Sequence, residues 1–307
     1  MKKLLTLILL LSVAFGSCDA SRRKAKHVVF IGIDGWAAYS LRDTPAEELP
    51  NIHYLMENGA WSTHKRSVMP SASAINWCTL FTGVPTEMHG YDKWNSKAPS
   101  ITPAQIGPNG MPSTIFTILR EQRPSAETGA IYNWDGIGYV IDTAAVDYHF
   151  YDESRAKKVP GYNPMGYVQT YMVPYIIEKT PELVLCYFGD LDAAGHGYGW
   201  DSPQYAEMLR KCDECIGVLI LALKDADIWD DTIIVLTTDH GGSGRGHGKF
   251  TIKELEGPVI ICGRKVRSNY EIPIPVMQYD ITAIAAYALG LDIPDWWVGR
   301  PFKSIFK

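Results

Sequence analysis

The sequence has little excess charge and no repetitive segment. Its 307 residues carry a formal net charge of -5, and this mild acidity argues against binding nucleic-acid polymers through bulk electrostatics. No low-complexity tract or internal repeat interrupts residues 27–307. With 46% hydrophobic and 21% charged residues, the composition is that of an ordinary globular protein with a sizeable core.

Long hydrophobic runs are also missing, except at the N-terminus. Residues 1–17 contain two lysines and then an apolar run too short to span a bilayer securely, which predicts an export signal. The residues before Cys18 resemble a bacterial lipobox, which predicts lipidation of Cys18; simple cleavage nearby is the alternative. We therefore expect a signal segment over 1–18, a tether over 19–26 and one domain over 27–307. The protein would be exported, to the bacterial periplasm or as a lipoprotein that touches the membrane only through its anchor.

Cysteines are few, and their spacing excludes a zinc finger. Without Cys18 five cysteines remain, so at least one is unpaired if the others form disulfides. Cys212 and Cys215 form a CxxC within a helical pattern, but no second pair follows and no βαβ unit precedes it. The pattern favours a surface helix carrying a local disulfide or free thiols over a redox motif.

Five nearly continuous apolar runs predict strands buried on both faces of a sheet. These runs cover residues 27–34, 130–134, 183–189, 232–238 and 258–263. Helical patterns lie between them, at about 46–58, 73–82, 113–121, 164–178, 203–224 and 279–288. This alternation predicts an α/β fold with a doubly wound, mostly parallel central sheet and helices on both faces, in three α/β/α layers. Ser202 and Pro203 predict a capped start for the longest helix.

Aspartate and histidine residues follow three of the predicted strands. Ligands bind at the carboxyl ends of strands in open α/β sheets, so the sheet would bring these residues into one cleft. Three Asp and three His are the ligands that two adjacent Zn²⁺ ions need, with coordination positions left open for chemistry. Mn²⁺ or Fe would fit the same ligand types. The predicted metal ligands are Asp34, Asp192, His196, Asp239, His240 and His247.

Local spacing supports two of these groups. Asp192 and His196 lie four residues apart in a small-residue segment that we expect to form a turn. Asp190 is an alternative to Asp192, although it lacks that spacing. Gly241 and Gly242 would allow the chain to turn directly after the Asp-His pair, so that both side chains reach one metal ion.

Ser73 is the predicted nucleophile. It opens the predicted helix over 73–82, and a helix N-terminus presents free N–H groups and partial positive charge to a phosphoryl group. A nearby metal ion would supply the alkoxide, because a free serine hydroxyl barely ionises near neutrality. Ser71 could compete for this role. Asn76 lies one turn further along, where its amide could hydrogen-bond a phosphoryl oxygen.

The order of these residues resembles the alkaline phosphatase superfamily, and most closely its nucleotide pyrophosphatase/phosphodiesterase (type I phosphodiesterase) branch. The similarity covers nearly the whole mature chain. It implies a hydrolase for a small phosphoester, with two zinc ions and a covalent intermediate on Ser73. By resemblance, one zinc would take Asp192, His196 and His247, and the other Asp34, Asp239 and His240. The motifs that carry the resemblance are IDG at 33–35, TG at 82–83, HG at 89–90, GHGYG at 195–199 and DHG at 239–241.

The chain departs from that branch at several positions. The branch usually has a Thr nucleophile and an Asn flanked by Pro and His, where this chain has Ser73, Ile75 and Trp77. His247 follows the Asp-His pair closely, whereas its counterpart comes much later, and the chain is shorter than typical members. Two other superfamily branches fit less well. No C/S-x-P-x-R segment supports a sulfatase, and there is no room for the inserted domain of a phosphoglycerate mutase.

The substrate is the least determined part of the prediction. A phosphomonoester dianion usually requires a further cation, which Arg245, Lys249 or Lys93 could supply, and an alkaline phosphomonoesterase is the main alternative. A non-catalytic surface binding module is a third possibility, which the complete ligand set argues against. The segment 95–112 is predicted to form a loop over the site. Aromatic residues near the motifs favour a diester with a base or aryl group: Trp77, Tyr91, Trp94, Tyr198 and Trp200.

Overall fold

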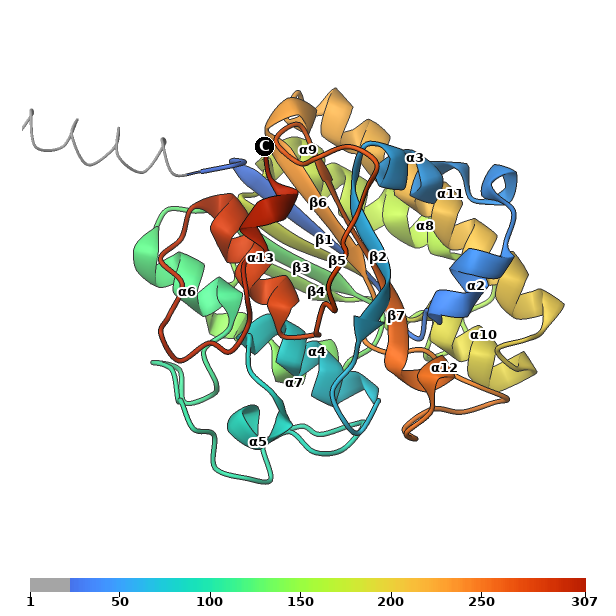
Figure 1. The fold of residues 1–307 in the computed structure, drawn as a ribbon, viewed down its shortest axis with the longest axis horizontal. Helices are drawn as coiled ribbons and strands as arrows, with labels where there is room; N and C mark the ends of the chain where they lie inside the picture. Colours follow the sequence, from blue (N-terminus) through green and yellow to red (C-terminus); the bar gives the residue numbers. More distant parts are fainter. Residues whose placement is uncertain (1–22) are drawn as a thin grey trace, which may run out of the picture.

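A central eight-stranded sheet organises the protein (Figure 1). The structure, a computed structural model, describes residues 23–307, so the predicted signal segment and Cys18 lie outside the described residues. The strand order is β4-β3-β5-β1-β6-β7-β2-β8. The strands are β1 (His27–Ile33), β2 (Gly59–Arg66), β3 (Thr128–Tyr132), β4 (Tyr148–Tyr151), β5 (Leu183–Phe188), β6 (Thr232–Thr237), β7 (Glu256–Gly263) and β8 (Tyr270–Glu271).

The sheet is mostly parallel, as predicted. Strands β4, β3, β5, β1 and β6 pair in parallel, and only β7 runs antiparallel to its neighbours β6 and β2. The five predicted strands correspond to β1, β3, β5, β6 and β7. The sequence patterns missed β2, β4 and β8, which are less continuously apolar and more exposed than the central strands.

Helices cover both faces of the sheet, which confirms the three-layer arrangement. Side chains alternate between the faces along β1: Val28 and Phe30 belong to one apolar core, and Val29 and Ile31 to the other. The first core is completed by α4 (Ser73–Thr82), α6 (Ile115–Gln122) and α13 (Asp280–Leu289). The second is completed by α3 (Pro50–Glu57), α8 (Pro164–Tyr167), α9 (Val173–Lys179) and α11 (Pro203–Asp225).

The six predicted helices are present, with some internal breaks. The predicted helix over 46–58 is a 3-10 turn followed by α3, and the one over 164–178 contains a π-helical segment between α8 and α9. The side chain of Ser202 accepts a hydrogen bond from the Tyr205 N–H (3.2 Å) and Pro203 begins α11, as expected. The other α-helices of the described residues are α2 (Ala38–Asp43), α5 (Thr86–His89), α7 (Ile137–Val140), α10 (Asp190–Tyr198) and α12 (Ile252–Leu255).

The CxxC segment differs from its prediction. Cys212 and Cys215 are both free thiols and both fully buried in the core beneath α11. Free thiols were one of the two predicted states, but the expected exposure of the pair was wrong, because both side chains lie in the apolar core rather than in solvent. Within residues 23–307, none of the helices has the length and apolarity needed to cross a bilayer.

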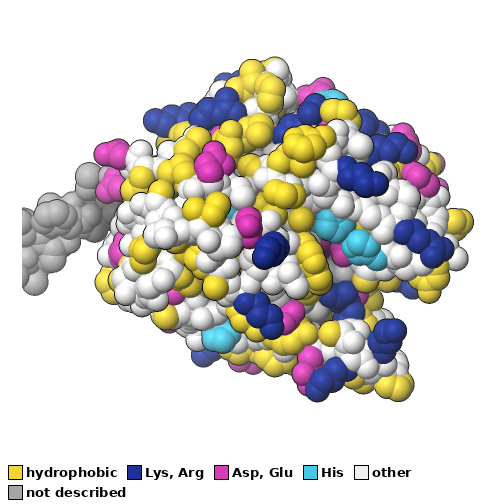
Figure 2. All heavy atoms as spheres, turned by 90° about the horizontal axis from the view of Figure 1, so that it is seen from below, with side chains coloured by type: hydrophobic (Ala, Val, Ile, Leu, Met, Phe, Trp, Pro, Cys, Tyr) yellow, Lys and Arg dark blue, Asp and Glu magenta, His cyan; other side chains and the backbone are white. Residues whose placement is uncertain are grey.

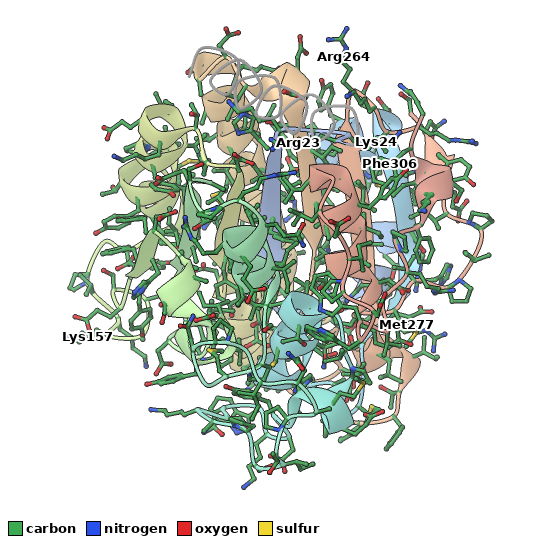
Figure 3. All side chains as sticks on the ribbon, turned by 90° about the vertical axis from the view of Figure 1, so that its left-hand side faces the viewer. Arg23, Lys24, Lys157, Arg264, Met277 and Phe306 are labelled. Carbon is green, nitrogen blue, oxygen red and sulfur yellow. The ribbon has the colours of Figure 1, made fainter. Side chains whose placement is uncertain are left out.

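The predicted tether ends before residue 26. The N–H groups of Lys24 and Ala25 donate to the carbonyl of Ala288 (2.8 and 3.0 Å), and Ala25 is buried. The Lys26 N–H donates to the carbonyl of Asp231 (3.0 Å). Lys24 lies beside the C-terminal segment that contains Phe306 (Figure 3). Residues 24–26, which were predicted to belong to the tether, therefore pack on the domain.

Candidate active site

Three neighbouring strands bring the predicted ligands together. Asp34 directly follows β1, Asp239 follows β6, and Asp192 lies in α10 just after β5. Because β5, β1 and β6 are adjacent and parallel, their carboxyl ends lie side by side at one edge of the sheet. Residues 190–198 form the helix α10 and not the expected turn, so Asp192 and His196 face the site from successive turns of one helix.

Asp34, Asp239 and His240 form the first cluster, and all three are buried. One ligand atom from each lies within 4.8 Å of the others. His240 Nε2 is 3.6 Å from Asp34 Oδ1 and 3.1 Å from Asp239 Oδ2. His240 Nδ1 donates to the carbonyl of Gly241 (2.8 Å), so the neutral imidazole presents its Nε2 lone pair to the two carboxylates.

Asp192, His196 and His247 form the second cluster, with the same design. Asp192 Oδ1 is 3.5 Å from His196 Nε2 and 3.8 Å from His247 Nε2. The Nδ1 atoms of the two histidines donate to the carbonyls of Arg245 (3.0 Å) and Ser71 (2.9 Å), which leaves both Nε2 atoms as acceptors. The rings of His247 and His240 stack with centroids 3.8 Å apart, so the two clusters are adjacent.

Gly35 allows the clusters to approach each other. Its φ of +68° is in the left-handed region, and a Cβ there would lie 2.9 Å from the Cβ of Asp192. Its N–H donates to Asp239 Oδ1 (3.1 Å). The glycine of the IDG motif is therefore required both for the turn after β1 and for close packing of α10.

Each of the three aspartates keeps one carboxylate oxygen without a partner. Asp34 Oδ1, Asp192 Oδ1 and Asp239 Oδ2 are buried and accept no hydrogen bond. A buried, unpaired carboxylate oxygen is costly unless a cation compensates it. These oxygens face the histidine Nε2 atoms, whose other ring nitrogens are fixed by backbone carbonyls. This ligand set and this outer shell fit two divalent metal ions of the zinc type.

The titration behaviour of the site agrees with that fit. Burial, followed by the charge of Asp34, holds the pKa values of Asp192 and Asp239 well above their usual range. Burial lowers the pKa of His240, and burial together with His240 lowers the pKa of His247 to about 3. Near neutral pH these two imidazoles are therefore neutral, which is the form that binds metal.

Ser73 is the first residue of α4 and lies beside the first cluster. Its Oγ is 3.2 Å from His240 Nε2, and its side chain lines the same cavity as Asp34 and Asp192. Ser71 is fully buried, and its hydroxyl donates to the Lys249 carbonyl (3.2 Å) and accepts from the Gly248 N–H (3.1 Å). The hydroxyl of Ser71 is thus used to hold the His247 loop, whereas that of Ser73 faces the clusters.

Asn76 does not lie where the sequence suggested. Its side chain is fully buried and is not part of the cavity wall. Oδ1 accepts from the Val68 N–H (2.8 Å), and Nδ2 donates to the carbonyls of Val68, Pro70 and Ala72 (3.2, 3.1 and 3.2 Å). The prediction that this amide reaches a phosphoryl oxygen therefore needs correction: Asn76 fixes the segment that leads into Ser73.

We expect Asn76→Ala to affect the stability of the fold more than it affects catalysis. The change leaves buried backbone groups of residues 68–72 without partners, which should cost about 2 to 4 kcal/mol of unfolding free energy. Urea unfolding followed by circular dichroism measures that loss. A variant with wild-type stability and a large loss of kcat would contradict this role and place the amide on the substrate.

A cavity of about 770 Å³ opens above the clusters. Ser73, Asp34, Asp192 and two of the ligand histidines line it. Figure 2 looks onto this end of the molecule and shows histidine side chains grouped near the centre of the face. The cavity is large enough for a small phosphoester together with its substituents.

Aromatic side chains form part of the cavity wall, but mostly not the predicted ones. Of the five predicted aromatic residues only Trp94 lines the cavity; Trp77, Tyr91 and Trp200 are buried and Tyr198 is exposed outside it. The sequence patterns missed Trp134 and Tyr187, which complete the aromatic wall.

Trp77 and Tyr187 instead orient Asp34, one of the predicted ligands. Trp77 Nε1 donates to Asp34 Oδ2 (3.0 Å), and the hydroxyl of Tyr187 donates to the same oxygen. This pair occupies Oδ2 and leaves Oδ1 facing His240. Such outer contacts fix the orientation of a ligating carboxylate.

The predicted cations also need revision. Arg245 and Lys249 are exposed and line no part of the cavity, and their backbone carbonyls serve as acceptors within the site. Lys93 does line the cavity, as does Arg155, which the sequence analysis missed. Residues 95–112 form a loop, as predicted, but none of them belongs to the cavity wall.

Comparison with known proteins identifies the family. The family model described as type I phosphodiesterase/nucleotide pyrophosphatase matches residues 28–254. The mouse bis(5'-adenosyl)-triphosphatase enpp4 is 25% identical over 291 residues, which are 90% of this chain and 57% of that protein. The human ectonucleotide pyrophosphatase/phosphodiesterase family member 5 is 24% identical, over 78% of this chain and 50% of that protein.

A solved structure supports the same fold. Murine ectonucleotide pyrophosphatase/phosphodiesterase 5 superimposes with a TM-score of 0.72 at 17% sequence identity, and the match covers 92% of this chain and 100% of that one. The chain spans about half the length of the curated relatives named above (57% and 50%). The chain belongs to the type I phosphodiesterase/nucleotide pyrophosphatase family of the alkaline phosphatase superfamily.

Proposed function

We propose that the protein is a metal-dependent phosphoric ester hydrolase that acts on small phosphodiesters or nucleotide pyrophosphates. The observation that carries this proposal is the set of three unpartnered carboxylate oxygens, which face three oriented histidines beside the hydroxyl of Ser73. Family membership supports it, and so does the triphosphatase activity for which the mouse relative enpp4 is named. Export and a lipid anchor remain predictions from residues 1–18.

The two clusters would each hold one divalent ion, with zinc as the first candidate and Mn²⁺ or Fe as others. Asp192, His196 and His247 would bind one ion, and Asp34, Asp239 and His240 the other. When bound, two such ions would promote ionisation of the Ser73 hydroxyl and neutralise charge on the phosphoryl oxygens.

Ser73 would carry the phosphoryl group between two displacement steps. Its Oγ, as the alkoxide, forms a bond to phosphorus while the bond to the leaving oxygen breaks, and the leaving alcohol takes a proton from solvent. Water then attacks the phosphoserine ester, which releases the phosphoryl product and restores the serine hydroxyl. Asp34 is held in place for this chemistry by Trp77 and Tyr187.

The cavity wall favours diesters. Trp94, Trp134 and Tyr187 offer aromatic surface to a base or an aryl group, which a simple monoester of phosphate would leave uncovered. The alternative is an alkaline phosphomonoesterase, for which Lys93 and Arg155 are the cations within the cavity. A non-catalytic binding module would not require a serine hydroxyl beside the His240 Nε2 atom.

A paired rate assay separates these functions. The purified, metal-loaded protein is given bis(p-nitrophenyl) phosphate, p-nitrophenyl thymidine 5'-monophosphate or p-nitrophenyl phosphate, each with a chelator control. We expect faster, chelator-sensitive turnover of the two diesters. Faster turnover of the monoester would show that the protein is a phosphomonoesterase rather than a phosphodiesterase. Absence of turnover of all three substrates with metal bound would favour a non-catalytic binding module.

The stabilisation by metal should grow as pH rises. In the metal-free fold the pKa values of Asp192 and Asp239 are raised, so their protonated forms favour folding and that stability is lost as pH rises above their ordinary range. Metal binding removes this penalty. His247, whose pKa is lowered to about 3, is neutral with or without metal over this range, so its titration cancels in the comparison.

The measurement is the difference in Tm between metal-loaded and chelated protein. We expect it to widen between about pH 5 and about pH 8. A difference that stays constant or narrows over this range would show that the buried carboxylates are not the groups that bind the metal.

A further inference from the structure

We propose that Arg155 binds a second anionic group of the substrate, adjacent to the phosphoryl group that Ser73 attacks. Arg155 would then be a specificity-determining residue, which favours substrates with a phosphate or carboxylate next to the scissile phosphate. This assignment rests on the function proposed above and adds to it the recognition of one particular substituent.

Arg155 lies in the loop between β4 and α8 and forms part of the cavity wall, together with Ser73, Asp192 and Trp134. Its guanidinium packs against the backbone at Gly189, directly before α10. A Cβ at position 189 would lie 2.7 Å from Arg155 Nη2. Glycine at this position therefore makes room for the guanidinium three residues from the ligand Asp192.

A buried network holds the guanidinium in one orientation. Arg155 Nε and Nη2 both donate to the carbonyl of Asn133 (3.2 and 3.0 Å). The Asn133 side chain donates to Asp190 Oδ2 (2.8 Å) and accepts from the Gly189 N–H (2.8 Å), and Tyr162 donates to Asp190 Oδ1 (2.9 Å). Asn133 and Asp190 are buried, so the side chain is fixed before any ligand arrives.

Most donors of this guanidinium are still available. Arginine has five N–H donors, and the Asn133 carbonyl is their only acceptor among residues 23–307. Within the same residues no carboxylate lies close enough to form an ion pair with Arg155. Nη1 donates to no described group. A planar fork with free donors, in the wall of a cavity, matches the geometry of a phosphate or carboxylate.

The guanidinium of Arg155 stays positively charged. Burial opposes its charged form, but the charge of Asp190, together with smaller contributions from Tyr187, Tyr162 and Asp34, raises the pKa of the guanidinium. Asp190 cannot replace a substrate anion as a partner, because both of its oxygens are occupied by Asn133 and Tyr162. Asp92 also lines the cavity, with Oδ1 unpartnered, and would repel an anion from that part of the wall. Lys93 is the other cation of the cavity wall, but it directly follows Asp92 in the chain, so Arg155 is the better placed of the two cations for the second anionic group.

A binding experiment isolates this contact from the chemical step. Metal-loaded Ser73→Ala protein is titrated by calorimetry with AMP and with α,β-methylene-ADP, which differ by one further phosphate. We expect α,β-methylene-ADP to bind more tightly than AMP, and we call this difference in affinity the gain from the second phosphate. Arg155→Gln in the Ser73→Ala background should reduce this gain by about 10- to 100-fold, because a charged hydrogen bond is lost. Arg155→Lys should restore only part of it, because lysine lacks the fork.

Two further variants control the interpretation. Lys157→Gln removes one positive charge from the same loop, but its Nζ pairs with Glu153 (2.6 Å), its side chain is exposed, and it lies at the periphery of the molecule (Figure 3). It should leave the gain from the second phosphate unchanged. Gly189→Ala keeps Arg155 but displaces its guanidinium, and should reduce the gain.

The outcomes are distinct. An unchanged gain in Arg155→Gln would overturn the assignment. An equal loss of affinity for AMP and α,β-methylene-ADP would also overturn it, since Arg155 would then act on the transferred phosphoryl group or on the site as a whole. Failure of both ligands to bind the metal-loaded Ser73→Ala protein would overturn the proposed function, and this assignment with it.

Discussion

Ser73→Ala is expected to lower kcat/KM for bis(p-nitrophenyl) phosphate by about 10⁴-fold or more, as loss of the nucleophile does in other covalent hydrolases. The Ser73 hydroxyl lies 3.2 Å from His240 Nε2, and Ser73 is the one serine or threonine among the described residues that line the cavity. Removal of one oxygen should leave the ligands in place. Metal content after dialysis should therefore equal that of the wild type.

Ser71→Ala is the matched control. It removes a hydroxyl two residues away that holds the loop of His247 through Gly248 and Lys249. We expect a loss of less than about 10-fold, together with weaker metal binding, because the loop would be less firmly fixed. Near-normal activity of Ser73→Ala, or a larger loss in Ser71→Ala, would contradict the choice of nucleophile.

His247→Ala should remove one metal ion and keep the other. His247 belongs only to the cluster with Asp192 and His196, whereas Asp34, Asp239 and His240 form a separate buried set. Loss of a direct ligand should weaken that one site by at least about 100-fold, since even outer-shell changes cost 10- to 100-fold. Metal analysis after dialysis should find about half of the wild-type metal, and diester turnover should fall with it.

His64→Ala provides the control for this result. His64 has an exposed side chain on β2, pairs with Glu256 and belongs to neither cluster. It should keep the full metal content and rate. Loss of both ions in His247→Ala would mean that the two sites bind as one unit, and loss of neither would remove His247 from the site.

The grouping of the six predicted ligands at one place could be predicted because its signal is topological. Asp34, Asp192 and Asp239 each follow a continuous apolar strand, and parallel strands end at one edge of the sheet. The strand order places β5, β1 and β6 next to each other. Strand patterns alone could not show this order, but the requirement that the six predicted ligands meet at one site implied it. Local conformation was less predictable: residues 190–198 form a helix although their small residues suggested a turn.

Predictions that depended on which way a side chain points were weaker. Helical spacing placed Asn76 one turn after Ser73, but all ten residues of α4 are buried, so spacing could not separate a substrate-facing side from a backbone-binding one. Trp77 was taken for a substrate contact, yet it contacts Asp34 from within the core. Arg155 lies in a polar loop with no motif, and only the packing against Gly189 and Asn133 brings it to the cavity.

Reconstitution of the metal-free protein tests the central claim most directly. The protein is stripped with a chelator, its metal content is verified, and the rate on bis(p-nitrophenyl) phosphate is recorded while zinc is added back. The two-cluster site predicts no turnover without metal and full recovery at about two equivalents of zinc. Full activity in verified metal-free protein, or saturation with zinc without any turnover, would contradict a two-metal phosphoesterase.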